Sequence, residues 1–203
     1  MEKGKLFIVS GPSGVGKGTI CKGLLGNRND MVFSVSMTTR EPREGEIEGV
    51  SYYFVSKEKF IETIENDGFL EYAEVFGNYY GTPRNEVEEK LKKGIDILLD
   101  IDVQGALQVK KKHPEGVGIF ILPPSIAELK KRILGRGTES EESISLRLSK
   151  ALKEMSYVEK YDYCVVNDYV DTVLKKVTTI VEAEHLKVSD DAILMVERFR
   201  EEL

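Results

Sequence analysis

Short apolar runs alternate along most of the chain with stretches whose apolar residues recur every three or four positions. The runs at 5–10, 95–101, 118–122 and 163–166 predict strands, and 95–101 is apolar enough for a sheet buried on both faces. Periodic stretches predict helices at 17–25, 103–112 and 170–186, and a further one at 189–203. This alternation predicts an α/β fold with a mainly parallel sheet.

Capping residues predict where further helices begin. Ser56 is placed to cap a helix that runs to residue 67. Pro83 is expected as the first residue of a helix that ends at Gly94. Two more helix starts, opening helices to 134 and to about 159, have capping-box spacing: Ser125 with Glu128, and Thr138 with Glu141.

The segment 38–80 departs from this regular order and is interpreted as a β-rich insert. A short strand at 32–36 precedes it, and two further strands are expected at 52–55 and 69–76. The stretch between 38 and 53 is polar and irregular, and the sequence GNYYGTP at 77–83 is expected to form a turn.

Composition narrows the class of protein. The 203 residues suit one compact domain, and 41% hydrophobic with 32% charged residues is typical of globular proteins. No apolar run is long enough for a bilayer, and a net charge of −6 argues against binding bulk nucleic acid. The two cysteines, Cys21 and Cys164, lack metal-ligand spacing, so we expect a reduced, cytoplasmic protein. No feature of the sequence implies an obligate protein partner.

The glycine-rich stretch SGPSGVGKGT at 10–19 lies between the first predicted strand and the first predicted helix. Gly11-x-x-x-x-Gly16-Lys17 has Walker A spacing in the context that the motif requires. Glycines let backbone N–H groups face a phosphate, the helix adds its positive end, and Lys17 supplies a cation. The predicted nucleotide site comprises Gly11, Pro12, Ser13, Gly14, Val15, Gly16, Lys17, Gly18 and Thr19.

The position after the lysine departs from this motif. Gly18 stands where a Ser or Thr hydroxyl usually contacts Mg²⁺, and Thr19 comes one place later. Either Thr19 contributes to the ion, or phosphates and waters hold most of it.

Two acidic residues, Asp100 and Asp102, stand at the end of a predicted buried strand. Because they are two residues apart, their side chains are expected to point the same way, at the edge where open α/β sheets bind ligands. Asp100 is expected to orient Mg²⁺-bound water, and Asp102 to contact a nucleotide.

Two arginines, Arg40 and Arg43, lie close together in the irregular stretch. Their guanidinium groups could clamp a phosphate bidentately, although a solvated loop is the better explanation when they are considered alone.

Taken together with the stretches at 51–54, 69–83 and 97–105, the phosphate loop and these arginines make the chain resemble the guanylate kinases. The family's markers match 11–17, 36–43, 52–54, 69–73, 77–82, 99–105 and 132–137, and the resemblance spans about 4–186. It implies Mg²⁺-dependent transfer of a phosphoryl group from ATP to GMP. It also implies a three-layer P-loop core, a GMP-binding lobe at about 37–83, a mobile helical lid at about 135–148 and a C-terminal extension at 187–203.

The resemblance also implies the GMP contacts. Phosphate contacts fall on Arg40, Arg43, Tyr52 and Tyr80, and guanine contacts on Ser36, Glu71, Thr82 and Asp102. The chemistry of Glu71 agrees, because one carboxylate can accept both N1–H and N2–H of guanine, whereas the N1 lone pair of adenine would face it. Without the resemblance, Glu71 could equally be an outward residue on a strand.

The resemblance places three arginines of the lid around the transferring phosphoryl group: Arg132, Arg136 and Arg147. Arg136 could instead stack on adenine, and Asn167 is a weaker adenine contact. With Lys17 and Arg40, these arginines form the predicted catalytic set. No general base is needed, because the attacking phosphate oxygen of GMP is already an anion.

Two other classes of function remain open. A guanylate-kinase-like binding module that has lost catalysis usually has a degraded phosphate loop, whereas Gly11–Lys17 is intact here. A kinase of the same fold with another acceptor is disfavoured by Glu71, Ser36 and the GNYYGT sequence.

Overall fold

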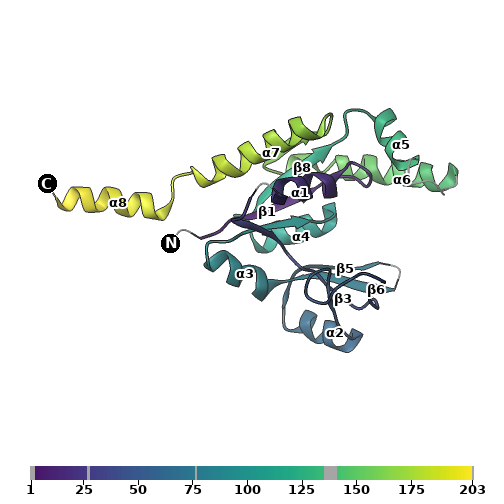
Figure 1. The fold of residues 1–203 in the computed structure, drawn as a ribbon, viewed down its shortest axis with the longest axis horizontal. Coiled ribbons are helices and arrows are strands. Elements are labelled where there is room, and N and C mark those ends of the chain that lie inside the picture. Colours follow the sequence, from purple (N-terminus) through teal and green to yellow (C-terminus); the bar gives the residue numbers. More distant parts are fainter. Residues whose placement is uncertain (1–2, 27, 76, 135–140, 203) are drawn as a thin grey trace.

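The computed structural model describes residues 3–26, 28–75, 77–134 and 141–202 (Figure 1). Its larger sheet has five strands in the order β2-β7-β1-β8-β9, and every neighbouring pair is parallel. These strands are β1 (Leu6–Ser10), β2 (Met31–Phe33), β7 (Asp96–Asp100), β8 (Val117–Leu122) and β9 (Tyr163–Val166). The predicted α/β class with a mainly parallel sheet is therefore confirmed.

Helices cover both faces of this sheet, because side chains alternate along each strand. Phe7 and Val9 of β1 pack in one apolar cluster with α1 (Lys17–Gly26) and α7 (Val170–His185). Leu6 and Ile8 point the other way and pack with α3 (Arg84–Lys92) and α4 (Val103–Lys112). The result is the expected three-layer core.

A second sheet of four strands in the order β4-β3-β6-β5 lies beside this core, at the bottom of Figure 1. Its strands are β3 (Met37–Thr38), β4 (Tyr53–Phe54), β5 (Phe69–Val75) and β6 (Asn78–Pro83). Helix α2 (Lys57–Glu65) packs on it through the buried Phe60, whose ring stacks on Phe69 with the centroids 4.4 Å apart.

The expected turn at 77–83 is wrong. Residues from Asn78 onward form β6, which pairs antiparallel with β5. Pro83 is consequently the last strand residue and precedes α3, whose first helical residue is Arg84. Glycine, asparagine and proline indicated a turn locally, but long-range pairing with β5 satisfies the backbone of this segment.

The helices α5 (Ile126–Leu134) and α6 (Glu141–Met155) pack together through a small apolar cluster. The Ser125 hydroxyl accepts from Glu128 N at 3.1 Å, as expected, whereas the Glu128 carboxylate pairs with Arg132. Helix α6 ends before residue 159 and is followed by the short 3₁₀ helix η1 (Val158–Lys160). Thr138, the other predicted cap, lies outside the described residues.

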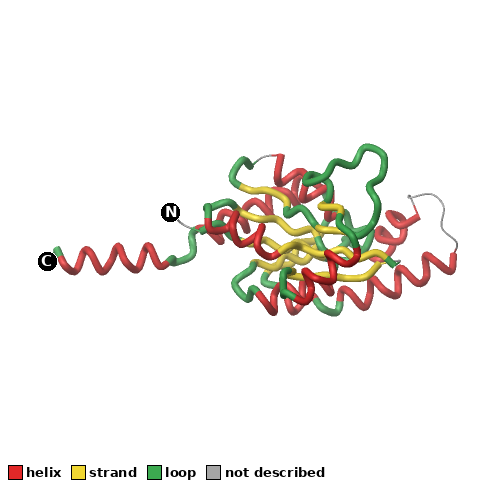
Figure 2. The backbone as a smooth tube through the Cα atoms, turned by 90° about the horizontal axis from the view of Figure 1, so that it is seen from below, coloured by secondary structure: helices red, strands yellow, loops and turns green. Residues whose placement is uncertain are grey.

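The last helix, α8 (Asp190–Glu201), stands away from the rest of the molecule (Figures 1 and 2). Every residue from Asp190 to Glu202 is exposed. The Ser189 hydroxyl caps its start by accepting from Ala192 N at 3.3 Å. Within the described ranges, no helix combines the length and apolarity needed to span a membrane.

Candidate active site

The predicted phosphate loop connects the carboxyl end of β1 to α1. Gly11 and Gly16 adopt φ angles of 146° and 99°, which side-chain-bearing residues rarely adopt. A Cβ on Gly11 would lie 2.4 Å from Ile121 O, and one on Gly16 would lie 2.6 Å from Asn167 Nδ2. Lys17 Nζ donates to Gly11 O at 2.8 Å, so the cation lies over the loop.

Two side chains from distant segments hold the Val15 carbonyl in this loop. Asn167, which follows β9, donates from Nδ2 to Val15 O at 2.7 Å, and Arg132 of α5 donates from Nη1 at 3.3 Å. Arg132 also donates to Asn167 O at 3.2 Å. The structure thus places both residues at the phosphate loop, where they fix its backbone.

The segment expected to form the lid reaches the same loop. Arg147 of α6 donates from Nη2 to Ser13 Oγ at 2.9 Å. Arg136, the remaining predicted arginine, lies outside the described residues. Arg132 and Arg147 are therefore not merely solvated in this structure, because both contact the phosphate loop.

Asp100, the last residue of β7, lies beside the start of α1. A Cβ on Gly18 would be 3.6 Å from Asp100 Oδ2, so Gly18 lies against the carboxylate, and Gly18 and Thr19 are both exposed. Solvent reaches Asp100, yet the surrounding protein removes enough water to raise the pKa of its carboxyl, an effect that the Lys17 ammonium opposes.

Asp102 has a local structural partner. Its Oδ1 accepts from Gly105 N at 2.8 Å and caps the N-terminus of α4. The sequence reasoning missed this cap, although an aspartate immediately before an apolar-periodic segment is the usual signal for one. The predicted nucleotide contact of Asp102 stays a prediction.

Glu71 and Thr82 lie opposite each other on β5 and β6. Thr82 Oγ1 donates to Glu71 Oε1 at 2.6 Å, and Glu71 is only 8% exposed. Burial raises the pKa of the Glu71 carboxyl, the hydrogen bond from Thr82 lowers it, and the charge of Asp102 raises it. The Thr82 hydroxyl therefore holds the carboxylate in place.

Three of the four residues expected to bind the GMP phosphate lie together: Arg40, Tyr52 and Tyr80. The Arg40 guanidinium carbon lies 5.5 Å from the centroid of the Tyr52 ring, and the rings of Tyr52 and Tyr80 meet edge to face at 6.0 Å. Arg43 is exposed and contributes its backbone N–H to Glu46 Oε2 at 2.8 Å. Ser36, the remaining predicted contact, is half-buried just before β3.

Glu46, which the sequence analysis did not single out, contacts both Arg40 and Arg43. Its Oε1 accepts from Arg40 Nη2 at 2.8 Å, and its Oε2 accepts from the backbone of Arg43. Both donors lower the pKa of the Glu46 carboxyl. The only available signal was an acidic residue three positions after Arg43 in an irregular loop.

Two buried hydroxyls lie at the carboxyl end of β1. Ser10 Oγ and Tyr161 Oη face each other, and neither has another hydrogen-bond partner among the described residues. Burial raises the pKa of Tyr161 to about 12. Neither residue carried a motif that sequence reasoning could have used.

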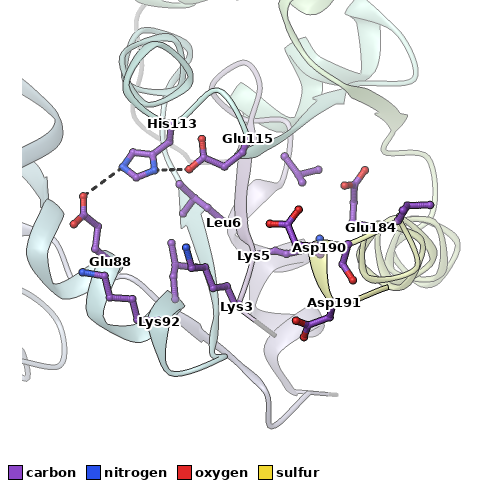
Figure 3. A pocket seen from close by; sticks show the side chains of 15 residues that line it. Lys3, Lys5, Leu6, Glu88, Lys92, His113, Glu115, Glu184, Asp190 and Asp191 are labelled. Carbon is purple, nitrogen blue, oxygen red and sulfur yellow. Dashed lines mark hydrogen bonds and ion pairs between the residues drawn. The ribbon is translucent and has the colours of Figure 1, made fainter. Parts of the chain in front are cut away.

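A cavity of about 660 Å³ lies at the opposite edge of the sheet (Figure 3). Its lining includes Leu6 and Val117, the first residues of β1 and β8. Both acidic and basic side chains line it. His113 lies between two carboxylates, with Nε2 3.8 Å from Glu88 Oε1 and Nδ1 3.0 Å from Glu115 Oε1. The amino ends of parallel strands do not form the ligand edge of such sheets, so this cavity is not the candidate site.

Comparisons with known proteins identify one family. The sequence profile described as guanylate kinase matches residues 3–184. A guanylate kinase of Clostridium tetani is 58% identical over 197 residues, covering 96% of this chain and 94% of that protein. One of Caldanaerobacter subterraneus subsp. tengcongensis is 51% identical, covering 99% of this chain and 97% of that protein.

A solved structure gives the same result. The crystal structure of guanylate kinase from Anaplasma phagocytophilum matches with a TM-score of 0.71 and 38% sequence identity. The match covers 92% of this chain and 89% of that one.

Proposed function

The chain belongs to the guanylate kinase family and is a phosphotransferase with guanylate kinase activity. From this premise we propose which of its residues bind the substrates and which act on them. The proposed donor is ATP, bound at the phosphate loop, and the proposed acceptor is GMP, bound at the second sheet. The deoxy form, dGMP, is proposed as an alternative acceptor.

The donor site uses backbone amides and Lys17. The positive φ angles of Gly11 and Gly16 fit a loop whose N–H groups face the phosphates, and α1 adds the positive end of its dipole. The Lys17 ammonium, now on Gly11 O, is placed to move onto the β- and γ-phosphates. Asn167 supports the loop by donating to Val15 O. Because Asn167 lies next to the phosphate loop, we propose that it also contacts the adenine base of ATP.

The acceptor phosphate is proposed to bind at Arg40, Arg43, Tyr52 and Tyr80. Arg40 already lies on the Tyr52 ring, and its guanidinium is held by the Glu46 carboxylate. That carboxylate accepts from Nη2 of Arg40, so an incoming phosphate would share this N–H group with Glu46 or displace Glu46 from it. The substrate thus meets a pre-oriented cation, which reduces the entropy lost on binding.

The guanine base is proposed to bind at Glu71, with Ser36 and Asp102 nearby. Thr82 fixes one carboxylate oxygen from β6, so the acceptor for N1–H and N2–H sits on a rigid strand. A bidentate base contact contributes about 1–3 kcal/mol of discrimination. This buried, hydrogen-bonded carboxylate is the single observation that carries the assignment of the guanine site.

In the transfer step, an oxygen of the GMP phosphate attacks the γ-phosphorus of ATP. A new P–O bond forms while the bond to the β–γ bridging oxygen breaks, so ADP leaves and GDP is produced. Lys17, Arg132, Arg136 and Arg147 are proposed to offset the negative charge that spreads over the phosphoryl oxygens. Positioning and electrostatics suffice, because the attacking oxygen is already ionised.

The residues at the end of β7 fit a magnesium ion carried by ATP. Asp100 is a carboxylate beside Lys17 and the open face of Gly18, and Mg²⁺ retains waters readily.

The described residues hold no cluster of three or more His, Cys, Asp or Glu side chains suited to a metal. We propose that Asp100 holds the ion through water, with direct ligation by Thr19 as the weaker alternative. When bound, the ion would neutralise charge on the phosphates.

The domain organisation is also a proposal. The second sheet lies between Met37 and Pro83 and is proposed as the GMP-binding lobe, with a lid at about 135–148 and an extension at 187–203. Closure of lobe and lid would bring the two anion sites together. Cys21 and Cys164 are free thiols, which supports the proposal of a reduced, cytoplasmic location.

A coupled assay of ADP release tests the acceptor. The protein is incubated with ATP and GMP, dGMP, AMP, UMP or IMP in turn, and GMP is expected to give the highest kcat/KM. Activity on AMP or UMP but not on GMP would contradict the proposed base site. No activity on any acceptor would favour a binding module.

A further inference from the structure

Helix α4 lies along the free edge of β5, the strand that carries Glu71. Three of its residues, Gly105, Gln108 and Lys112, contact this strand or the turn before it. Because they are spaced three and four residues apart, they lie on one face of the helix. The opposite edge of β5 pairs with β6, so α4 takes the place of a neighbouring strand.

Gln108 makes the contact that resembles a strand most closely. Tyr72 N donates to Gln108 Oε1 at 3.2 Å, and Gln108 Nε2 donates to Tyr72 O at 3.2 Å. A side-chain amide thus satisfies both backbone groups of the residue that follows Glu71. Such paired contacts fix the position of a strand along and across its edge.

The other two contacts lie on either side of Gln108. Lys112 Nζ donates to Phe69 O at 2.6 Å and pairs with Asp67 Oδ1 at 2.8 Å. A Cβ on Gly105 would lie 3.0 Å from Glu71 Oε2, which is tighter than ordinary contact. The absence of a side chain at 105 therefore lets the Glu71 carboxylate approach the helix backbone.

The same helix begins at the phosphate side of the molecule. Its N-cap, Asp102, stands two residues after Asp100 at the end of β7. Helix α4 therefore connects the edge where ATP is proposed to bind with the strand that is proposed to recognise guanine.

We propose that Gln108 is a positioning residue for guanine selectivity, acting through Tyr72 on the carboxylate of Glu71. This inference rests on the proposed guanine contact of Glu71. Two parallel hydrogen bonds to N1–H and N2–H require both carboxylate oxygens to lie in the plane of the base. A small displacement of β5 weakens the bond to the exocyclic amine, whereas binding of ATP at the phosphate loop is unaffected.

The test compares GMP with IMP, which lacks the 2-amino group. For Gln108→Ala we expect the ratio of kcat/KM values, GMP over IMP, to fall about tenfold, since two hydrogen bonds of modest net strength are lost. KM for ATP and kcat at saturating GMP should stay within about twofold of the parent values. Lys111→Ala, a truncation of an exposed side chain on the same helix, should leave the ratio unchanged.

Gln108→Glu provides a second variant that keeps the side-chain length. Its carboxylate still accepts from Tyr72 N, but its other oxygen faces the Tyr72 carbonyl and repels it, so the ratio should fall at least as far as in Gln108→Ala. An unchanged GMP/IMP ratio in both Gln108 variants would overturn the inference. A fall in kcat/KM by the same factor for both nucleotides, with a lower melting temperature, would also overturn it by showing a purely structural role.

Glu71→Gln, measured in parallel, separates this inference from the function on which it rests. If Glu71→Gln leaves the GMP/IMP ratio unchanged, the proposed guanine site is wrong. If Glu71→Gln lowers the ratio and Gln108→Ala does not, the guanine site stands and the role of Gln108 is wrong.

Discussion

Replacing Thr82 by valine removes the donor that holds the guanine-site carboxylate. Valine has nearly the shape of threonine, so the backbone pairing between β5 and β6 should survive. The substitution removes the 2.6 Å hydrogen bond that Thr82 Oγ1 donates to Glu71 Oε1. Glu71 is only 8% exposed, so water can replace this donor only poorly. The ionised carboxylate then remains buried without that partner.

The size of the effect follows from the charge on Glu71. A hydrogen bond to a charged group contributes about 1.5–3 kcal/mol, and 1.36 kcal/mol corresponds to a tenfold change in an ionisation equilibrium. Loss of this bond should therefore favour protonated Glu71 by a factor of about ten to a hundred. Burial already raises the pKa of this carboxyl, and Thr82 is what opposes that rise, so the variant's pKa moves further upward.

The sign of the pH dependence is fixed by what guanine requires. Only ionised Glu71 accepts from both N1–H and N2–H, so guanine binding weakens as pH falls through the pKa of this carboxyl. The acidic limb of kcat/KM for GMP should thus lie at higher pH in Thr82→Val than in the parent protein.

The assay is kcat/KM for GMP measured across the acidic range for the parent, Thr82→Val and Thr82→Ser. The titration of the GMP phosphate is common to all three, so only the displacement between curves counts. Thr82→Ser keeps the hydroxyl and should stay close to the parent curve. Superimposable acidic limbs for the parent and Thr82→Val would refute the reasoning.

Three further substitutions test the phosphate loop. Lys17→Ala should lower kcat by at least about a hundredfold while the melting temperature stays unchanged, because a charge-stabilising donor is lost from an intact fold; a drop in both would point to a structural lysine instead. Asn167→Ala removes the 2.7 Å bond to Val15 O and should raise KM for ATP about fivefold in steady-state kinetics, and a rise confined to KM for GMP would contradict that placement. Gly11→Ala puts a Cβ 2.4 Å from Ile121 O and should lower the free energy of unfolding by about 1–3 kcal/mol in urea titrations, whereas an unchanged midpoint would show that the loop relaxes freely.

Local signals explain why the donor site could be predicted from the sequence. The phosphate loop is contiguous, and the strand before it and the helix after it both have clear apolar patterns. The order of strands and helices in the core followed from the same patterns, and the structure confirms it. Only residues close in sequence were needed for these inferences.

Contacts between distant segments could not be predicted in this way. Arg132 and Val15 are 117 residues apart, and nothing near either residue indicates that they meet. The pairing of Glu71 with Thr82 depends on the register of a hairpin that was misinterpreted as a turn. Glu46 was missed because a carboxylate in a polar loop has no distinguishing neighbours.

The detachment of α8 means that its folding is nearly independent of the catalytic body. None of its 12 residues is fully buried, so the helix depends largely on its Ser189 cap and on acids at its start and arginines at its end. An isolated helix of this length is marginally stable in water. Its amide protons should therefore exchange with deuterium much faster than those of β1, and a melting curve followed by circular dichroism would contain a gradual helix–coil component beneath the cooperative transition of the core.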